Sequence, residues 1–168
     1  MENGKPLPEY MDMVSVKLEM NDDVCVFSMK VASPVPDKPI LEQGVKMQFW
    51  YWVINSDLNA WSQGPWPFPP AHMFWYAPEF RIVVKWDGEM FSAFLVDYRP
   101  RQAGGEVLFR DVPFVINEKE LSVTVEAWML GDLTDFFWGA STVDWIAEHT
   151  GNFAMRGVDT TGLGHWQP

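Results

Sequence analysis

The sequence MVSVKLEMNDDVCVFSMKV, from Met13 to Val31, contains two runs in which apolar and polar residues alternate. The polar residues Asn21, Asp22 and Asp23 separate the two runs and are typical of a tight turn. Since successive side chains of a strand point to opposite faces, the pattern predicts a β-hairpin with one apolar face. That face contains Val14, Val16, Leu18 and Met20 in the first strand and Cys25, Phe27, Met29 and Val31 in the second.

The same alternation recurs along the chain and predicts further strands. These strands cover Met47–Ile54, Phe80–Trp86, Met90–Asp97, Val107–Phe109, Val112–Ile116, Leu121–Ala127 and Phe136–Thr142. Asp87-Gly88 is typical of a hairpin turn, and the prolines within Ser33–Gln43 predict a loop. Short strands at hairpin spacing indicate an all-β fold: an antiparallel β-sandwich, jelly-roll or immunoglobulin-like, with about eight or nine strands.

The length of 168 residues is that of one domain, so we expect a single sandwich over the whole chain. We expect residues 1–11 and 151–168 to be irregular, because no period is visible there. Val143–His149 is predicted to form one short helix. Trp166, near the end of the glycine-containing tail, is expected to pack back onto the body of the protein.

Charge and composition exclude several function classes. The formal net charge of −11 disfavours nucleic acid as a partner, because phosphate binding needs clustered Lys and Arg. No apolar run approaches the roughly 20 residues of a membrane span. Cys25 is the only cysteine, so no intrachain disulfide is possible. No signal-peptide pattern is visible, so the chain is cytoplasmic or, where a signal has been removed, extracellular or periplasmic.

The stretch Phe49–Tyr76 contains five of the ten tryptophans and runs from a predicted strand into a proline-rich loop. Loops normally lie on the surface, whereas large aromatic side chains normally seek the interior. The loop is therefore either a plug over one end of the core or a rigid aromatic platform for a ligand. In the second reading Trp61, Trp66 and Trp75 stack on sugar rings, and Gln63 and His72 bond hydroxyl groups. We expect four other tryptophans to belong to the core: Trp50, Trp52, Trp86 and Trp138.

The start of this loop also suggests a cation site. Asn55, Asp57 and Asn59 place oxygen-bearing side chains at alternate positions, and calcium takes six to eight oxygen ligands. The glycine and the final glutamate of an EF-hand are missing. The alternative is an Asx-turn in which these side chains bond the local backbone.

The signals for catalysis are weaker. Asp97 follows Phe91, Ala93 and Leu95 on one strand face, so its carboxyl is either buried with a raised pKa or paired with an arginine, Arg99 or Arg81. If the protein is an enzyme, Asp97 and His72 are the candidate acid and base. His72 and its neighbour Met73 would have to face each other across a pocket to hold a haem, and we do not expect haem.

Several pieces of the chain together carry a family resemblance. They are Asp12–Val16 with Asp22–Met29, Phe49–Asn59, Ala77–Ile82 with Trp86-Asp87-Gly88, Asn117–Ala127 and Phe136–Ala140. In outline they resemble the strands and the acidic loop of the DOMON-like sandwich group, which includes the family 9 carbohydrate-binding modules. The resemblance implies a binding module with a structural calcium and a sugar or haem ligand.

We therefore expect a non-catalytic carbohydrate-binding module that binds its ligand through the tryptophan-rich loop. The prediction allows for a structural calcium but does not require one. One alternative is an enzyme that acts on a small apolar substrate in a pocket lidded by the aromatic loop. Further alternatives are a haem-binding DOMON-like domain and a domain whose exposed aromatic residues dock a partner protein.

Overall fold

The computed structural model describes residues 7–42, 44–56, 78–102, 104–131, 133, 135–147, 153–161 and 164–166. Within them the strands are β1 Met13–Met20, β2 Val24–Val31, β3 Val45–Asn55, β4 Phe80–Trp86, β5 Phe91–Asp97, β6 Leu108–Asp111, β7 Phe114–Asn117, β8 Glu120–Glu126, β9 Phe136–Ala147, β10 Phe153–Thr160 and β11 Gly164–Trp166. The helical elements are the 3-10 helices η1 Glu9–Met11 and η2 Ala127–Leu130 and the short α2 Arg99–Gln102.

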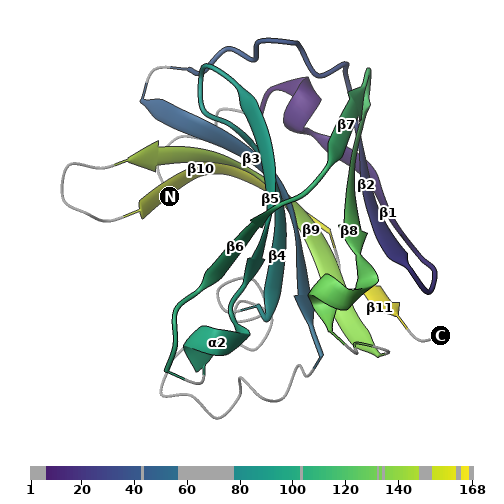
Figure 1. Cartoon of the computed structure of the whole chain (residues 1–168). Helices are drawn as coiled ribbons and strands as arrows, with labels where there is room; N and C mark the ends of the chain where they lie inside the picture. The colour runs from purple at the N-terminus through teal and green to yellow at the C-terminus, as the bar shows by residue number, and fades with distance from the viewer. Residues whose placement is uncertain are drawn as a thin grey trace.

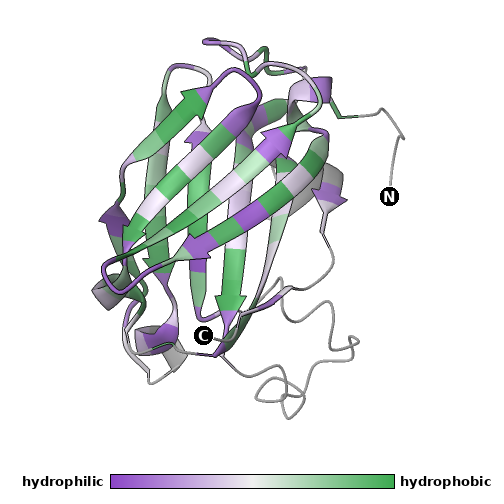
Figure 2. Cartoon of the chain, turned by 90° about the vertical axis from the view of Figure 1, so that its right-hand side faces the viewer, coloured by the Kyte–Doolittle hydropathy of each residue, from purple (hydrophilic) through white to green (hydrophobic). Residues whose placement is uncertain are grey.

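The strands form two antiparallel sheets that face each other (Figure 1). The smaller sheet has the order β1-β2-β8-β7. The larger has the order β10-β9-β3-β4-β5-β6, and β11 pairs with the first part of β9. The prediction of an all-β sandwich is confirmed. Hydrophilic and hydrophobic residues alternate along the strands that face the viewer in Figure 2, as expected for strands with one face on a core.

The core between the sheets is strongly aromatic. Trp50 and Trp52 of β3 and Phe27 of β2 are completely buried, and the rings of Phe27 and Trp52 lie 6.2 Å apart. Trp86 is buried as well, so three of the four predicted core tryptophans are confirmed. Trp138 is only partly buried, beneath β11, where a Cβ on Gly164 would come within 2.7 Å of the indole. A glycine is therefore needed where β11 crosses this ring.

The alternation in β1 was predicted correctly except at its start. Val14 is 61% exposed, whereas the sequence pattern placed it on the core face with Leu18. The pairing of β1 with β2 shifts between Met13 and Ser15, which is a bulge. A bulge adds one residue to one strand and turns its side chain out of the alternating pattern.

The C-terminal predictions were wrong. Val143–His149 was expected to be helical, but β9 continues to Ala147 and pairs with both β3 and β10. The tail was expected to be irregular from residue 151, but Phe153–Thr160 and Gly164–Trp166 form β10 and β11. These strands raise the number to eleven within the described residues. The prediction for Trp166 is confirmed, since its ring stacks on Phe136 at 6.5 Å.

Candidate functional site

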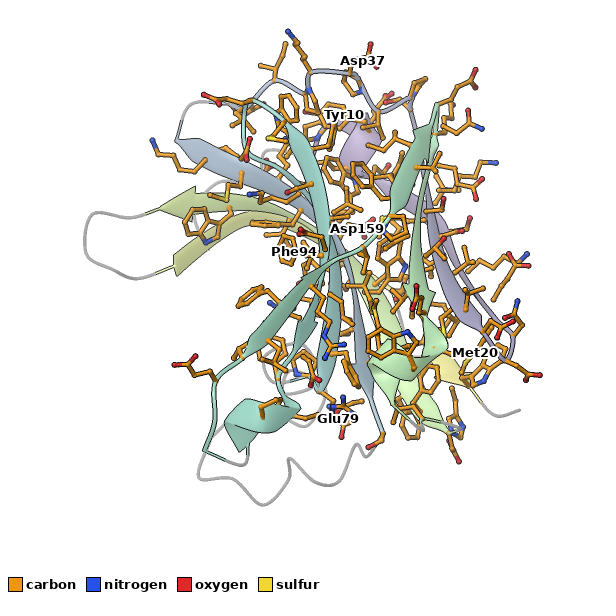
Figure 3. The ribbon with its side chains drawn as sticks, in the orientation of Figure 1. Tyr10, Met20, Asp37, Glu79, Phe94 and Asp159 are labelled. Atoms are coloured by element: carbon orange, nitrogen blue, oxygen red, sulfur yellow. The ribbon has the colours of Figure 1, made fainter. Side chains whose placement is uncertain are left out.

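The segment 57–77 joins the end of β3 to the start of β4, and the structure describes both of its attachment points. The carboxylate of Glu79 accepts hydrogen bonds from the backbone N–H and the hydroxyl of Ser56, at 2.7 and 3.0 Å. The backbone N–H of Glu79 donates to the carbonyl of Ile54, and its carbonyl accepts from Tyr98 at 2.8 Å. Glu79 therefore ties β3, β4 and the end of β5 together at this end of the sandwich (Figure 3).

Most of the predicted ligand residues fall within that segment. Asp57, Asn59, Trp61, Gln63, Trp66, His72 and Trp75 lie outside the described residues. Their roles as a sugar platform, as calcium ligands and, for His72, as an acid or base stay predictions.

Asn55, the first predicted calcium ligand, is the last residue of β3 and is completely buried. Both carboxylate oxygens of the nearby Glu79 already accept hydrogen bonds from Ser56. The described residues contain no group of three or more His, Cys, Asp and Glu that could hold a metal ion. The side chains described at this end therefore do not by themselves form a six-oxygen calcium site, and the function proposed below includes no calcium.

Asp97 lies on the inner face of β5, where it is buried opposite Phe80. Its carboxylate accepts hydrogen bonds from Nε and Nη2 of Arg99, at 3.0 and 2.8 Å, and from the Arg99 backbone N–H. Burial is the largest single influence and favours the neutral acid, but the bonds and charge of Arg99 and the charge of Arg110 outweigh it. The pKa of Asp97 is therefore lowered, and of the two predicted possibilities the structure has the ion pair with Arg99.

Arginines at this end of the larger sheet rest on aromatic rings. The guanidinium of Arg99 lies 4.3 Å from the ring centre of Phe80. On the outer face of the sheet, Arg81 lies 5.1 Å from the ring centre of Tyr51 and 5.7 Å from that of Tyr98. Contacts of this kind contribute about 0.5–1 kcal/mol each at exposed sites, and they hold the guanidinium groups in place.

Trp128 is a strongly exposed aromatic side chain at this end, as is Phe109 of β6. Trp128 belongs to η2, which follows β8, and it is 63% exposed. The guanidinium of Arg110 lies 5.1 Å from its ring centre, and its indole N–H donates to the carboxylate of Glu126. At Gly131, which ends η2, a Cβ would stand 2.8 Å from Nη1 of Arg99, so η2 packs directly on the Asp97–Arg99 pair.

The set of Trp128, Arg110 and Glu126 offers a flat apolar surface beside hydrogen-bond donors and acceptors, and we call it the indole platform. The sequence patterns did not identify it. The inward positions Leu121, Val123 and Val125 place Glu126 on the outer side of β8, but Trp128 lies in η2 beyond the strand, so the alternation does not orient its ring. Arg110 could not be assigned, because its contact with Trp128 joins the two sheets.

Comparison of the chain with protein-family models, with curated proteins and with solved structures gave no match. The resemblance to DOMON-like modules therefore stays a hypothesis that rests on the sequence pieces given above. No helix in the part of the chain that the structure describes is long and apolar enough to cross a membrane.

Proposed function

We propose that this protein is a non-catalytic carbohydrate-binding module and that its indole platform contacts the sugar. The observation that carries the proposal is that Trp128 is 63% exposed while the guanidinium of Arg110 lies against its ring. An exposed indole held by a neighbouring side chain loses little conformational entropy when a ligand stacks on it.

Each residue of the platform has a part in binding a sugar. The indole face of Trp128 packs on the C–H face of a pyranose ring, an apolar contact of large area. The guanidinium of Arg110 donates hydrogen bonds to hydroxyl oxygens, and the carboxylate of Glu126 accepts them from hydroxyl groups. Such a site binds with millimolar to micromolar dissociation constants, or about 4–8 kcal/mol.

Local charge favours a neutral glycan over an acidic one. Asp97 and Glu126 lie close to Arg110, and Glu79 adds a further negative charge beside Arg99. These three carboxylates lie near Arg99 and Arg110, Arg81 adds a positive charge on the outer face of the sheet, and the chain as a whole has a net charge of −11. An anionic sugar would be repelled, whereas hydroxyl groups can pair with either kind of side chain.

The lowered pKa of Asp97 supports a binding role for this end. A general acid or base works best when its pKa lies near the working pH, and the Asp97 carboxylate stays ionised and bonded to Arg99. Asp97 therefore acts as an anchor for Arg99 beneath η2.

The test is isothermal titration calorimetry with a panel of neutral oligosaccharides. Trp128→Ala is expected to weaken binding of the recognised glycan at least tenfold, and Arg110→Gln is expected to weaken it less. Phe109→Ala is the matched control. Phe109 precedes Arg110 in β6 and is 68% exposed, but it points to the outer face of the sheet, away from the indole platform.

Two results would contradict the proposal. The first is that no glycan of the panel binds. The second is that Trp128→Ala binds as tightly as the wild type. If instead Trp61→Ala or Trp66→Ala abolishes binding and Trp128→Ala does not, the sugar site belongs to the segment 57–77 and the indole platform is not part of it.

A further inference from the structure

A groove of about 470 Å³ opens between the two sheets at the end opposite the indole platform. Asp37, on its rim, and Glu79, at the platform end, lie at opposite ends of the molecule in Figure 3. The loop that follows β2 forms one wall through Pro34 and Pro36, and β7 forms the other through Phe114. The groove is therefore separate from the proposed sugar site.

The walls of the groove are held by the fold. The backbone N–H of Val35 donates to the carbonyl of Glu118 at 2.8 Å, which fastens the proline-containing loop to the turn between β7 and β8. Phe91 lines the groove, and its ring lies 4.8 Å from Trp86 and 6.0 Å from Trp50, both of which are buried. The volume falls within the roughly 300–1,000 Å³ of small-molecule sites, so the groove is large enough for a ligand of one ring.

The lining combines apolar rings with two negative charges. The side chains of Asp37 and Glu118 are exposed and belong to the lining of the groove. The nearest positive charges in the sequence are Lys38 and Lys119. Neither lysine lines the groove, and the Lys119 ammonium donates to the carbonyl of Ala32 at 2.8 Å. The charged side chains that line the groove are therefore both negative, in a chain whose net charge of −11 also attracts cations.

We propose that this groove binds a small organic cation, an aromatic or aliphatic ring with a protonated amine. The ring packs between the prolines and Phe114 and over Phe91, and the ammonium group lies at the rim between Asp37 and Glu118. The two parts of the ligand match the two parts of the lining, and neither a neutral sugar nor an anionic compound does so.

The experiment is calorimetric titration with 2-phenylethylammonium, with 2-phenylethanol and 3-phenylpropionate as neutral and anionic analogues of the same shape. We expect the amine to bind at least tenfold more tightly than the alcohol, and the propionate not to bind. Higher salt should weaken binding of the amine alone, because screening acts on the charged contact. In NMR spectra, the methyl resonances of Val35 and Ile116 should shift on addition of the amine.

The double variant Asp37→Asn/Glu118→Gln should lose the preference for the amine while its binding of the alcohol stays unchanged. Asp22→Asn/Asp23→Asn is the matched control, since it removes the same charge from the exposed β1–β2 turn. The proposal is overturned if none of the three compounds binds, if the alcohol equals the amine, or if the groove variant keeps the preference. These measurements use no sugar, so they are independent of the function proposed above.

Discussion

Trp52 and Trp128 show two opposite uses of the same side chain. Trp52 is a strand residue on the inner face of β3, completely buried against Phe27. Trp128 follows a strand, in a 3-10 turn, and is 63% exposed against Arg110. Composition alone therefore does not identify a binding residue in this protein. What matters is whether the tryptophan lies on the core face of a strand, as Trp52 does, or beyond the end of a strand, as Trp128 does.

Replacement of the buried ring should give the largest effect. Trp52→Ala leaves a cavity in the core and is expected to lower the free energy of unfolding by about 3–5 kcal/mol. Trp128→Ala should change it by less than about 0.5 kcal/mol, because the ring is exposed. Urea unfolding followed by circular dichroism measures both values. Equal losses for the two variants would remove the distinction between the two regions.

Replacement of Asp97 tests how much the Asp97–Arg99 ion pair contributes to the free energy of unfolding. Asp97→Asn is expected to cost about 1–3 kcal/mol at neutral pH, since it removes charge-assisted hydrogen bonds from a buried position. Asp111→Asn, an exposed carboxylate on β6, serves as the control and should cost little.

The effect of Asp97→Asn should depend on pH in a defined direction. The pKa of Asp97 is lowered in the folded protein, so the pair stabilises the fold at any pH above the unfolded-state value of about 4. This stabilisation is lost as the pH falls through the lower folded-state pKa. The gap between wild type and Asp97→Asn should therefore shrink below about pH 4. A gap of the same size at pH 7 and pH 2.5 would contradict the assignment.

Gly131 and Gly104 provide the comparison with the smallest expected difference in the free energy of unfolding. The φ of 70° and ψ of −158° at Gly131 are open almost only to glycine, and a Cβ there would press on Arg99. Gly104 also has a positive φ, of 85°, but has no heavy atom within 4 Å of the same position. Gly131→Ala should therefore cost about 1 kcal/mol more than Gly104→Ala, by urea unfolding. Equal costs would mean that a Cβ at Gly131 is accommodated as easily as one at Gly104.

Features that depend on neighbours in sequence were predicted well. The hairpin of β1 and β2 and the bounds of β4 follow from alternation and from turn residues such as Asp22 and Asp87, which act locally. The prediction of a helix at Val143–His149 was wrong, because a short apolar run is compatible with both the helical and the strand period. Its pairing with β3 and β10, distant in sequence, selects the strand.

For Asp97, both outcomes were compatible with the sequence, because burial and ion pairing shift a pKa in opposite directions. The direction depends on the distance to Arg99, and only the folded chain sets that distance.

By itself, the sequence determined that this protein is an antiparallel β-sandwich with an aromatic core and an acidic surface. Period-2 alternation, turn chemistry and net charge are properties of the chain, whatever it packs against. The packing of the two sheets is what places Trp128 against Arg110 from the other sheet and keeps Asp97 ionised. It also encloses a groove between the proline-containing loop and β7. Each of these depends on contacts between segments that only the packing of the two sheets brings together.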